Sequence, residues 1–292
     1  MSQTVTSQLF VTGASGQLGH LVVAALLRRV PAARIVAGVR NPQSQAAQDL
    51  RAQGVTVRIC DYARPDTLAE AFAGVDRLLL ISSSEVGQRV PQHRNVIAAA
   101  SRAGIGLIAY TSLLRADTSP LGLAGEHRAT EAILAESGVP AVILRNGWYS
   151  ENYTASLPAA LAHGVMLGSA GAGRIASAAR ADYAEAAAVV LTAEATGARV
   201  YELAGDEAYT LDAFAAAAAQ ASGRPIRYQD LPAPEYRAAL LAAGLPAGVA
   251  SLLADSDAGA AQGALFDDGH ALRALIGRPT TPLESVIATA LA

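Results

Sequence analysis

Lysine is absent from this 292-residue sequence, and all 22 of its basic residues are arginine. Without lysine the protein cannot use a P-loop phosphate lysine, a Schiff base, pyridoxal chemistry, or the strand lysine of protein kinases. It also lacks the Tyr-x-x-x-Lys pair of the usual short-chain dehydrogenases. The arginine- and alanine-rich composition is typical of a biased genome, but these exclusions hold whatever its origin.

Cysteine, net charge and long apolar runs are also scarce. The single cysteine, Cys60, allows neither an intramolecular disulfide nor a cysteine-cluster metal site, and the five histidines show no metal-ligand spacing. No apolar run approaches the roughly 20 residues that cross a bilayer, and a formal net charge of −3 argues against binding to nucleic acid. With no signal peptide in view, we expect a cytoplasmic protein with a small-molecule partner, no metal and no membrane.

Strands and helices alternate through the first half of the sequence. Short β-branched and leucine-rich runs are each followed by a segment with apolar residues at helical spacing, such as Leu18, Leu21 and Val22. Six such units in series predict a doubly wound parallel Rossmann sheet, an α/β fold with helices on both faces. The predicted strands are residues 8–12, 34–39, 55–59, 77–81, 106–110 and 140–144.

The alternation stops after about residue 149. Glycine and alanine crowd residues 155–181, and residues 200–203 form a lone strand-like run. We therefore expect a Rossmann domain that binds NADP over residues 1–150 and a smaller, mostly helical substrate-binding part over residues 151–292, with approximate boundaries and some interleaving. Its predicted helices are residues 211–222, 233–243, 247–254 and 270–276.

The strongest local motif is Gly13-Ala14-Ser15-Gly16-Gln17-Leu18-Gly19, between the first strand and the first helix. Its first glycine permits a sharp turn, its second lets backbone approach a pyrophosphate, and its third lets the helix pack close to the sheet. The phosphates would then face the helix N-terminus, where unpaired N–H groups favour an anion. A glycine triplet alone is weak evidence, but here it lies in the required strand–turn–helix context and predicts a dinucleotide site.

The residue after the second strand distinguishes the two nicotinamide cofactors. An NAD site would place Asp or Glu there, whereas this sequence has Val39-Arg40-Asn41. The guanidinium of Arg40 suits a 2′-phosphate, because its planar fork can pair with phosphate oxygens. The alternative is an ordinary surface arginine. We predict NADPH/NADP+ as the cofactor.

Side chains just after the later strands are candidates for contact with cofactor or substrate, because ligands of such sheets bind at the carboxyl ends of the strands. We expect Asp61 and Tyr62 near the adenine, and the serines after the fourth strand near the ribose and phosphates. Loop serines also commonly cap helices, and a tyrosine at a strand end is often simply packed. The further candidates are Ser82, Ser83 and Ser84 for the cofactor, Tyr110 and Asn146 near the nicotinamide, and Trp148, Tyr149 and Tyr153 as an aromatic substrate wall.

Six stretches of the sequence are characteristic as a set: residues 13–19, 81–89, 109–124, 144–153, 201–206 and 276–281. Together they resemble the NmrA-like family of atypical short-chain dehydrogenases, and particularly its quinone-reducing members, to which dye reductases are related. The resemblance implies two-electron reduction of a quinone by NADPH, with the substrate held between the two domains. Some NmrA-like enzymes carry a lysine early in the helix before the sixth strand, where this chain has Glu126-His127-Arg128, so a lysine-dependent mechanism is not expected.

Quinone reduction makes the missing lysine tolerable. Hydride transfer to a quinone gives a stabilised hydroquinone anion, which needs at most a hydrogen-bond donor, whereas an alkoxide needs a positioned acid or base. We therefore expect catalysis mainly by alignment of two flat rings, with Asn146, Tyr149 and either Tyr110 or His127 donating to the quinone oxygen. His127 could be a proton donor near neutral pH, or a helix histidine with no such role.

Two other functions remain open from sequence. The chain could be a redox-sensing regulator that binds NADP(H) without turnover, or a reductase of another aromatic electrophile such as a triphenylmethane dye. The alanine-rich C-terminal helices could pack within one chain or across a dimer interface, which leaves a monomer or a homodimer.

Overall fold

The computed structural model describes residues 7–194 and 199–292, which form two compact units. The first unit contains residues up to Ala116 together with Gly125–Arg145 and Tyr183–Tyr201, and the second contains Asp117–Ala124, Asn146–Asp182 and Glu202–Ala292. The units are thus more strongly interleaved than a single boundary near residue 150 implies. In particular, residues 183–201 return to the first unit, because the last strand of its sheet lies there.

A seven-stranded sheet forms the centre of the first unit, in the order β3-β2-β1-β4-β5-β6-β8. The neighbours β1 and β2, β1 and β4, β2 and β3, and β4 and β5 pair in parallel, which confirms the predicted doubly wound sheet. The strand-like run near residue 200 belongs to this sheet beside β6, and not to the C-terminal part where we placed it. The strands are β1 (Leu9–Val11), β2 (Ile35–Val39), β3 (Thr56–Ile59), β4 (Arg77–Leu80), β5 (Leu107–Leu113), β6 (Ala141–Asn146) and β8 (Arg199–Leu203).

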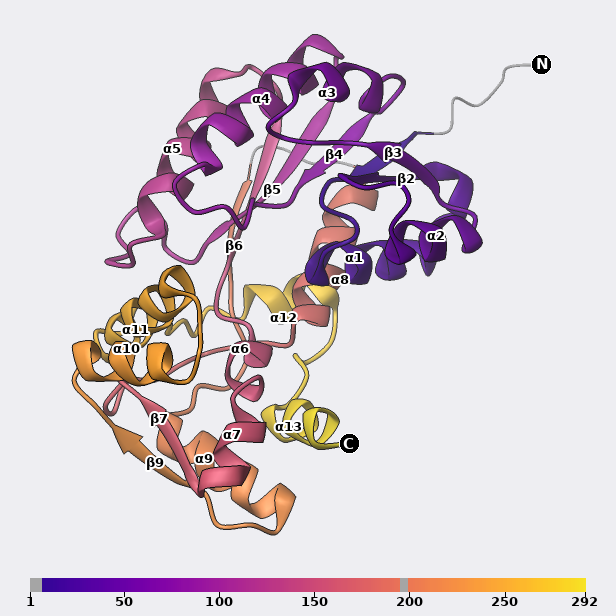
Figure 1. The fold of residues 1–292 in the computed structure, drawn as a ribbon. Helices are drawn as coiled ribbons and strands as arrows, with labels where there is room; N and C mark the ends of the chain where they lie inside the picture. The colour runs from indigo at the N-terminus through magenta and orange to yellow at the C-terminus, as the bar shows by residue number, and fades with distance from the viewer. Residues whose placement is uncertain (1–6, 195–198) are drawn as a thin grey trace. The chain divides into compact units, whose positions relative to one another are not determined.

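Helices cover both faces of this sheet. Figure 1 shows α3, α4 and α5 along one face and α1, α2 and α8 along the other. Phe10 of β1 and Phe72, just after α3, meet edge to face at 5.1 Å between ring centroids inside the core. The inner strands are almost fully buried, which explains why they read as continuous apolar runs. The helices are α1 (Gln17–Leu27), the short 3-10 turn η1 (Ala32–Arg34), α2 (Gln45–Ala52), α3 (Pro65–Ala71), α4 (Arg89–Arg102), α5 (Ala124–Glu136) and α8 (Arg180–Thr192).

The fifth and sixth strands extend further than predicted. Thr111 and Ser112 belong to β5, so Tyr110 is a fully buried strand residue and does not stand at the end of the strand. The predicted strand ended at residue 110, before these two hydroxyl residues, yet both are buried with polar partners. Thr111 Oγ1 accepts from Ser82 N–H at 2.8 Å, and Ser112 Oγ donates to Glu131. Such partners allow polar residues inside a buried strand.

The second unit is mostly helical, as predicted, but it also has a two-stranded parallel sheet of β7 and β9 that we did not predict. The predicted helices near 211, 233 and 270 are present, and the one predicted at 247–254 continues to Ala261. Short helices in the glycine- and alanine-rich stretch were missed, because they lack a clear apolar period. The elements are α6 (Ser150–Thr154), α7 (Leu157–His163), β7 (Val165–Gly168), α9 (Leu211–Ser222), β9 (Arg227–Asp230), α10 (Ala233–Ala242), α11 (Ala247–Ala261), α12 (Ala271–Ile276) and α13 (Leu283–Leu291).

Two aspartates, one of them fully buried, hold a loop of the second unit. Asp182 is fully buried, and its carboxylate accepts from Arg278 Nη2 at 2.7 Å, Thr281 N–H at 2.8 Å and Thr281 Oγ1 at 3.0 Å. Asp206 accepts from Thr280 N–H at 3.0 Å. Charge-assisted hydrogen bonds of this kind are stronger than neutral ones, so residues 278–281 are held by two carboxylates from distant parts of the sequence.

Candidate functional site

The first unit contains a pocket of about 370 Å³ at the carboxyl ends of β1, β2, β3 and β4. Every predicted cofactor residue except Tyr110 lines it. Four lining residues were not predicted: Cys60, Ile81, Glu85 and Gln92. Its full lining is Gly13, Ser15, Gly16, Gln17, Leu18, Gly19, Arg40, Cys60, Asp61, Tyr62, Ile81, Ser82, Ser83, Ser84, Glu85 and Gln92.

The glycine motif forms one wall of the pocket, and two of its glycines are required by the backbone. Gly13 has φ +57°, a conformation that favours glycine. A Cβ on Gly19 would lie 2.2 Å from the carbonyl oxygen of Gly13, so no larger residue fits. Gly16 is the N-cap of α1, and the first amides of that helix have no partners within it. The wall therefore offers N–H groups and the positive end of a helix dipole to an anion.

Arg40 follows β2 at the pocket and is paired with an acidic side chain from another strand end. Arg40 Nη1 lies 2.9 Å from Glu85 Oε1, and the two side chains are 71% and 47% exposed. The other carboxylate oxygen of Glu85 accepts from Gln92 Nε2 at 2.7 Å. Gln92 is buried, and its Oε1 has no hydrogen-bond partner among the described residues.

Tyr62 also lines the pocket and links the ends of three strands. Its hydroxyl donates to the carbonyl of Ile81 at 2.8 Å and is hydrogen-bonded to Thr12 Oγ1. Thr12 Oγ1 also accepts from Ile81 N–H at 3.0 Å. Burial raises the pKa of Tyr62 well above 10, so the phenol stays neutral. Asp61 accepts from Ala63 N–H at 3.0 Å in a local turn. The ends of β1, β3 and β4 are thereby tied together around the pocket.

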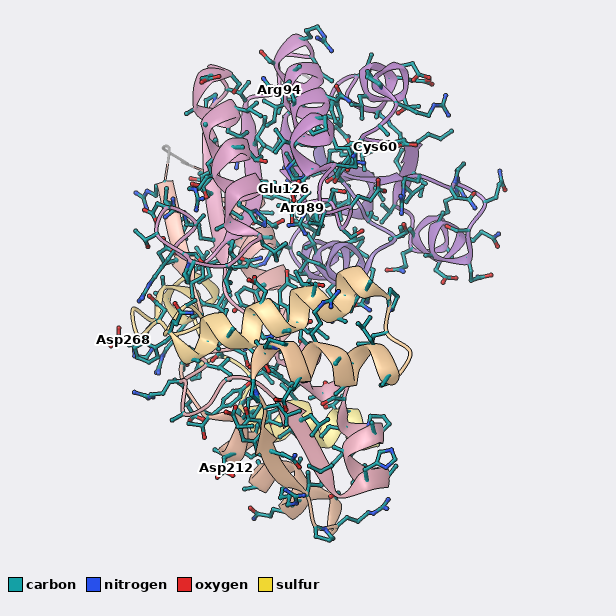
Figure 2. The ribbon with its side chains drawn as sticks, turned by 60° about the vertical axis from the view of Figure 1, so that its left-hand side comes forward. Cys60, Arg89, Arg94, Glu126, Asp212 and Asp268 are labelled. Atoms are coloured by element: carbon teal, nitrogen blue, oxygen red, sulfur yellow. The ribbon has the colours of Figure 1, made fainter. Side chains whose placement is uncertain are left out.

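The loop after β4, residues 81–88, is called the serine loop below, and side chains from α4 and α5 hold it. Ser83 N–H donates to His93 Nε2 at 2.9 Å, and Ser83 O accepts from Arg89 Nε at 2.5 Å. Gly87 N–H donates to Glu126 Oε1 at 3.0 Å. Arg89 and Glu126 lie close together in Figure 2, and the carboxylate acts electrostatically on the guanidinium. The backbone of this pocket wall is thus fixed by buried side chains.

The hydrogen bonds also determine where the protons of His93 and His127 lie. Nε2 of His93 accepts from a backbone amide, so its Nδ1 must donate, and it faces Thr130 Oγ1 at 2.9 Å. Nε2 of His127 lies 3.5 Å from Arg89 Nη1, which can only donate, so its Nδ1 donates to Tyr110 Oη at 2.7 Å. Burial and then the charge of Arg89 lower the pKa of His127 to about 3 and that of His93 to about 4.

Tyr110 and His127 are therefore a buried pair and do not line the pocket. Tyr110 is fully buried, its hydroxyl is also bonded to Thr130, and burial raises its pKa well above 10. His127 is neutral at physiological pH. A proton donor near neutral pH would need a pKa near 7, so this geometry gives the expected acid role of His127 no support.

Asn146 and the aromatic residues predicted to meet substrate belong to the second unit. Asn146, at the end of β6, is buried and hydrogen-bonded to the Tyr149 hydroxyl, while its Oδ1 has no partner among the described residues. The Arg180 guanidinium lies over the Tyr149 ring at 4.7 Å. Burial raises the pKa of Tyr149, so its phenol is a neutral hydrogen-bond donor. Trp148, which precedes Tyr149 in the sequence, is also buried.

Tyr153, the third predicted aromatic, is tied to a buried carboxyl group. Its hydroxyl donates to Asp257 Oδ1 at 3.3 Å, and its ring lies 5.8 Å from that of Phe214. Asp257 Oδ2 accepts from Ser169 N–H at 3.0 Å. Burial raises the pKa of Asp257 to about 6. The structure thus places the Tyr153 hydroxyl in the core of the second unit.

The functional residues that sequence reasoning missed are mostly partners of predicted ones. Arg89 and His93 stand four residues apart on α4, so they share one helix face, and both contact the backbone of Ser83. That spacing is visible in the sequence, but nothing in it names Ser83 as the target. Cys60 lines the pocket, yet burial raises its pKa to about 12 and makes it a poor nucleophile. Within residues 7–194 and 199–292, no cluster of histidine, cysteine and acidic side chains could hold a metal ion.

The chemical groups that line the pocket suit the phosphates of a dinucleotide. The pocket combines a glycine turn that excludes larger residues, a helix N-terminus, an arginine at the strand end and an unpartnered buried amide oxygen.

Of the helices in the described part of the chain, none has the length and apolar character needed to cross a membrane.

Comparison with known proteins points in the same direction. The sequence matches the NmrA-like family over residues 5–274. It is 60% identical to Quinone oxidoreductase 2 of Escherichia coli over 277 residues, which are 94% of this chain and 96% of that protein.

Among the solved structures that resemble this chain, two examples each match nearly its whole length. A crystal structure of the NADPH-dependent quinone oxidoreductase from E. coli, complexed with NADPH, matches with a TM-score of 0.94 and 57% identity over 98% of this chain and 100% of that one. The Citrobacter sp. triphenylmethane reductase complexed with NADP(H) matches with a TM-score of 0.92 and 37% identity over 97% of this chain and 100% of that one.

Proposed function

The chain belongs to the NmrA-like family, and we propose that it is an NADPH-dependent oxidoreductase that reduces quinones to hydroquinones by two-electron transfer. The observation that carries this proposal is the pocket at the carboxyl ends of β1–β4, which is lined by both the glycine turn and Arg40. The chain that forms this pocket is 60% identical to a quinone oxidoreductase. NADPH supplies the hydride when it is bound.

Each part of the pocket has a role in holding that cofactor. The Gly13–Gly19 turn and the start of α1 would hold the pyrophosphate through backbone N–H groups, and Arg40 would hold the 2′-phosphate. The serine loop, fixed by Arg89 and His93, would present Ser82–Ser84 to the ribose and phosphates. These contacts bind and orient the cofactor, which is the main requirement when the acceptor is already electrophilic.

The acceptor needs little proton assistance in this proposal. The hydroquinone anion is stabilised by its own ring, and a neutral hydrogen-bond donor is enough to favour it. We assign that donation to the side chains of Asn146 and Tyr149, with Trp148 providing aromatic surface. Neither Tyr110 nor His127 needs to act on the substrate, since both hydroxyl and imidazole already have buried partners.

The test is a panel of acceptors with NADPH oxidation followed at 340 nm. We expect turnover with small quinones and formation of the hydroquinone without a semiquinone signal in electron paramagnetic resonance. Preferential turnover of a triphenylmethane dye would replace quinone as the acceptor. Cofactor binding without oxidation by any acceptor would instead identify a redox sensor and overturn the enzymatic proposal.

Calorimetric titration with NADP+ and NAD+ tests the cofactor assignment. Removing the guanidinium in Arg40→Gln should weaken NADP+ by about tenfold or more and leave NAD+ nearly unchanged, because charge-assisted hydrogen bonds to phosphate are lost. Equal binding of NADP+ and NAD+ by the unmodified protein would show that Arg40 does not select the cofactor.

We further propose that the protein works in the cytoplasm, as a monomer or homodimer. The single cysteine is buried and forms no disulfide, which is compatible with a reducing compartment. Sedimentation at micromolar concentration would distinguish the two assemblies, and localisation of a tagged chain would test the compartment.

A further inference from the structure

The Arg40–Glu85 pair at the cofactor pocket has a consequence for cofactor choice. Arg40 comes from the end of β2 and Glu85 from the serine loop, 45 residues later, and both line the pocket. Isolated ion pairs on the surface contribute little. This carboxylate, however, is also held from the other side by Gln92, a buried side chain of α4, and the Glu85 N–H donates to Ser83 Oγ at 3.1 Å.

Glu85 is therefore an anchored anion beside the only basic side chain among the residues that line the pocket. A 2′-phosphate carries a charge of about −1.5 to −2 at neutral pH, so it must share or take the guanidinium that Glu85 now engages. The carboxylate also repels the phosphate directly. Both effects weaken NADPH binding, and neither acts on NADH.

The same carboxylate can favour the cofactor without the phosphate. NAD-specific sheets hold the adenosine ribose hydroxyls with an Asp or Glu at the end of the second strand, and this chain has Arg40 there instead. Glu85 supplies a carboxylate at the same corner of the pocket from a different strand end. It is an acceptor only, and ribose hydroxyls are donors.

We propose that Glu85 is a specificity-determining residue, which competes with the 2′-phosphate for Arg40 and accepts hydrogen bonds from the ribose hydroxyls of NADH. Arg40 and Glu85 together set the ratio of the two cofactor affinities, and Gln92 holds Glu85 in position. The protein consequently keeps measurable affinity for NADH, although its arginine favours NADPH.

The variant Glu85→Gln tests this proposal by calorimetric titration with NADP+ and NAD+, which does not depend on turnover. Loss of the charge should tighten NADP+ by roughly threefold, the size expected for an exposed pair, and weaken NAD+ by a similar factor. The gain for NADP+ should shrink between 20 mM and 500 mM salt because the repulsion is screened, whereas the loss for NAD+ should persist.

Two further variants make the result specific. Glu136→Gln removes the same charge at the exposed end of α5 and should change neither affinity. In the Arg40→Gln background, Glu85→Gln should tighten NADP+ by less, since no guanidinium is left to compete for. An unchanged ratio, a parallel change in both affinities or an equal gain without Arg40 would overturn the proposal. Because only binding is measured, a failure of quinone turnover would leave this result intact.

Discussion

Buried polar side chains have different roles in the two units of this protein. In the first unit, the buried side chains of Arg89 and His93 hold the backbone N–H and carbonyl of Ser83, a residue that lines the pocket. In the second unit, Asp182 and Asp257 use their carboxylates to hold backbone amides of loops. The geometry of holding a backbone group is the same. What differs is whether the held backbone faces a pocket, so loss of a holder should impair binding in one unit and stability in the other.

The largest effect is expected from Asp182→Ala. Its removal leaves Thr281 N–H and the Arg278 guanidinium without their carboxylate, and the free energy of unfolding should fall by about 3 kcal/mol. Urea denaturation would measure the loss. Asp268→Ala, an exposed aspartate of the same unit, is the control and should change stability by less than about 0.5 kcal/mol. A loss no larger than the control would show that Asp182 is dispensable to the fold.

Gly19→Ala probes the pocket in the first unit. The new Cβ would collide with the Gly13 carbonyl, so the turn must shift and the affinity for NADP+ should fall by about 100-fold. Calorimetric titration measures this. Gly125→Ala in α5 is the matched control, because a Cβ there meets nothing within 4 Å, and alanine is the better helix former. Unchanged binding in Gly19→Ala would mean that the turn does not hold the cofactor.

Asp257→Asn sharpens the contrast through pH. The folded pKa of Asp257, about 6, lies above its ordinary value of 3.8, so its contribution to stability is present below pH 3.8 and is lost as pH rises through 6. Asparagine cannot ionise, and it can keep one oxygen for Ser169 N–H while donating to the Tyr153 hydroxyl. The variant should therefore be more stable than the parent by about 2 kcal/mol at pH 8.

Unfolding of the parent and of Asp257→Asn in urea at pH 4.5, 6 and 8 would show this difference growing with pH. Asp268→Asn serves as a control, with no pH-dependent difference expected. If the difference in unfolding free energy between the parent and Asp257→Asn stays constant over this range, the raised pKa of the Asp257 carboxyl group is contradicted.

The smallest effect is expected for the pH dependence of His127→Asn. Asparagine can replace the donor that faces Tyr110, and the parent imidazole is already neutral with a pKa near 3. The shape of the kcat profile between pH 5.5 and 8.5 should be the same in both proteins. If an inflection near pH 6.5 disappears in the variant, His127 is the proton donor after all, and the buried network serves chemistry as well as loop position.

The two units also differ in how much of them could be predicted. The β–α alternation of the first half, the glycine motif and Arg40 can each be read from neighbouring residues of the sequence. They indicated NADPH as the cofactor and a resemblance to the NmrA-like family, and the comparisons confirm both. Strands β7 (Val165–Gly168) and β9 (Arg227–Asp230) were not predicted, because both are short and partly exposed. Residues 199–203 were also misplaced, since pairing with β6 is a long-range contact.

The sequence by itself determined the glycine turn between β1 and α1, because a turn between a strand and a helix depends on residues next to each other in the chain. Composition also excluded every lysine-dependent mechanism. Tertiary structure alone decided that Tyr110 and His127 are buried partners, that Ser83 is held by α4, and that Glu85 faces Arg40. Tyr110 and His127 are 17 residues apart and Arg40 and Glu85 are 45 apart, and burial keeps Tyr110 and His127 neutral. No local pattern in the sequence encodes either property.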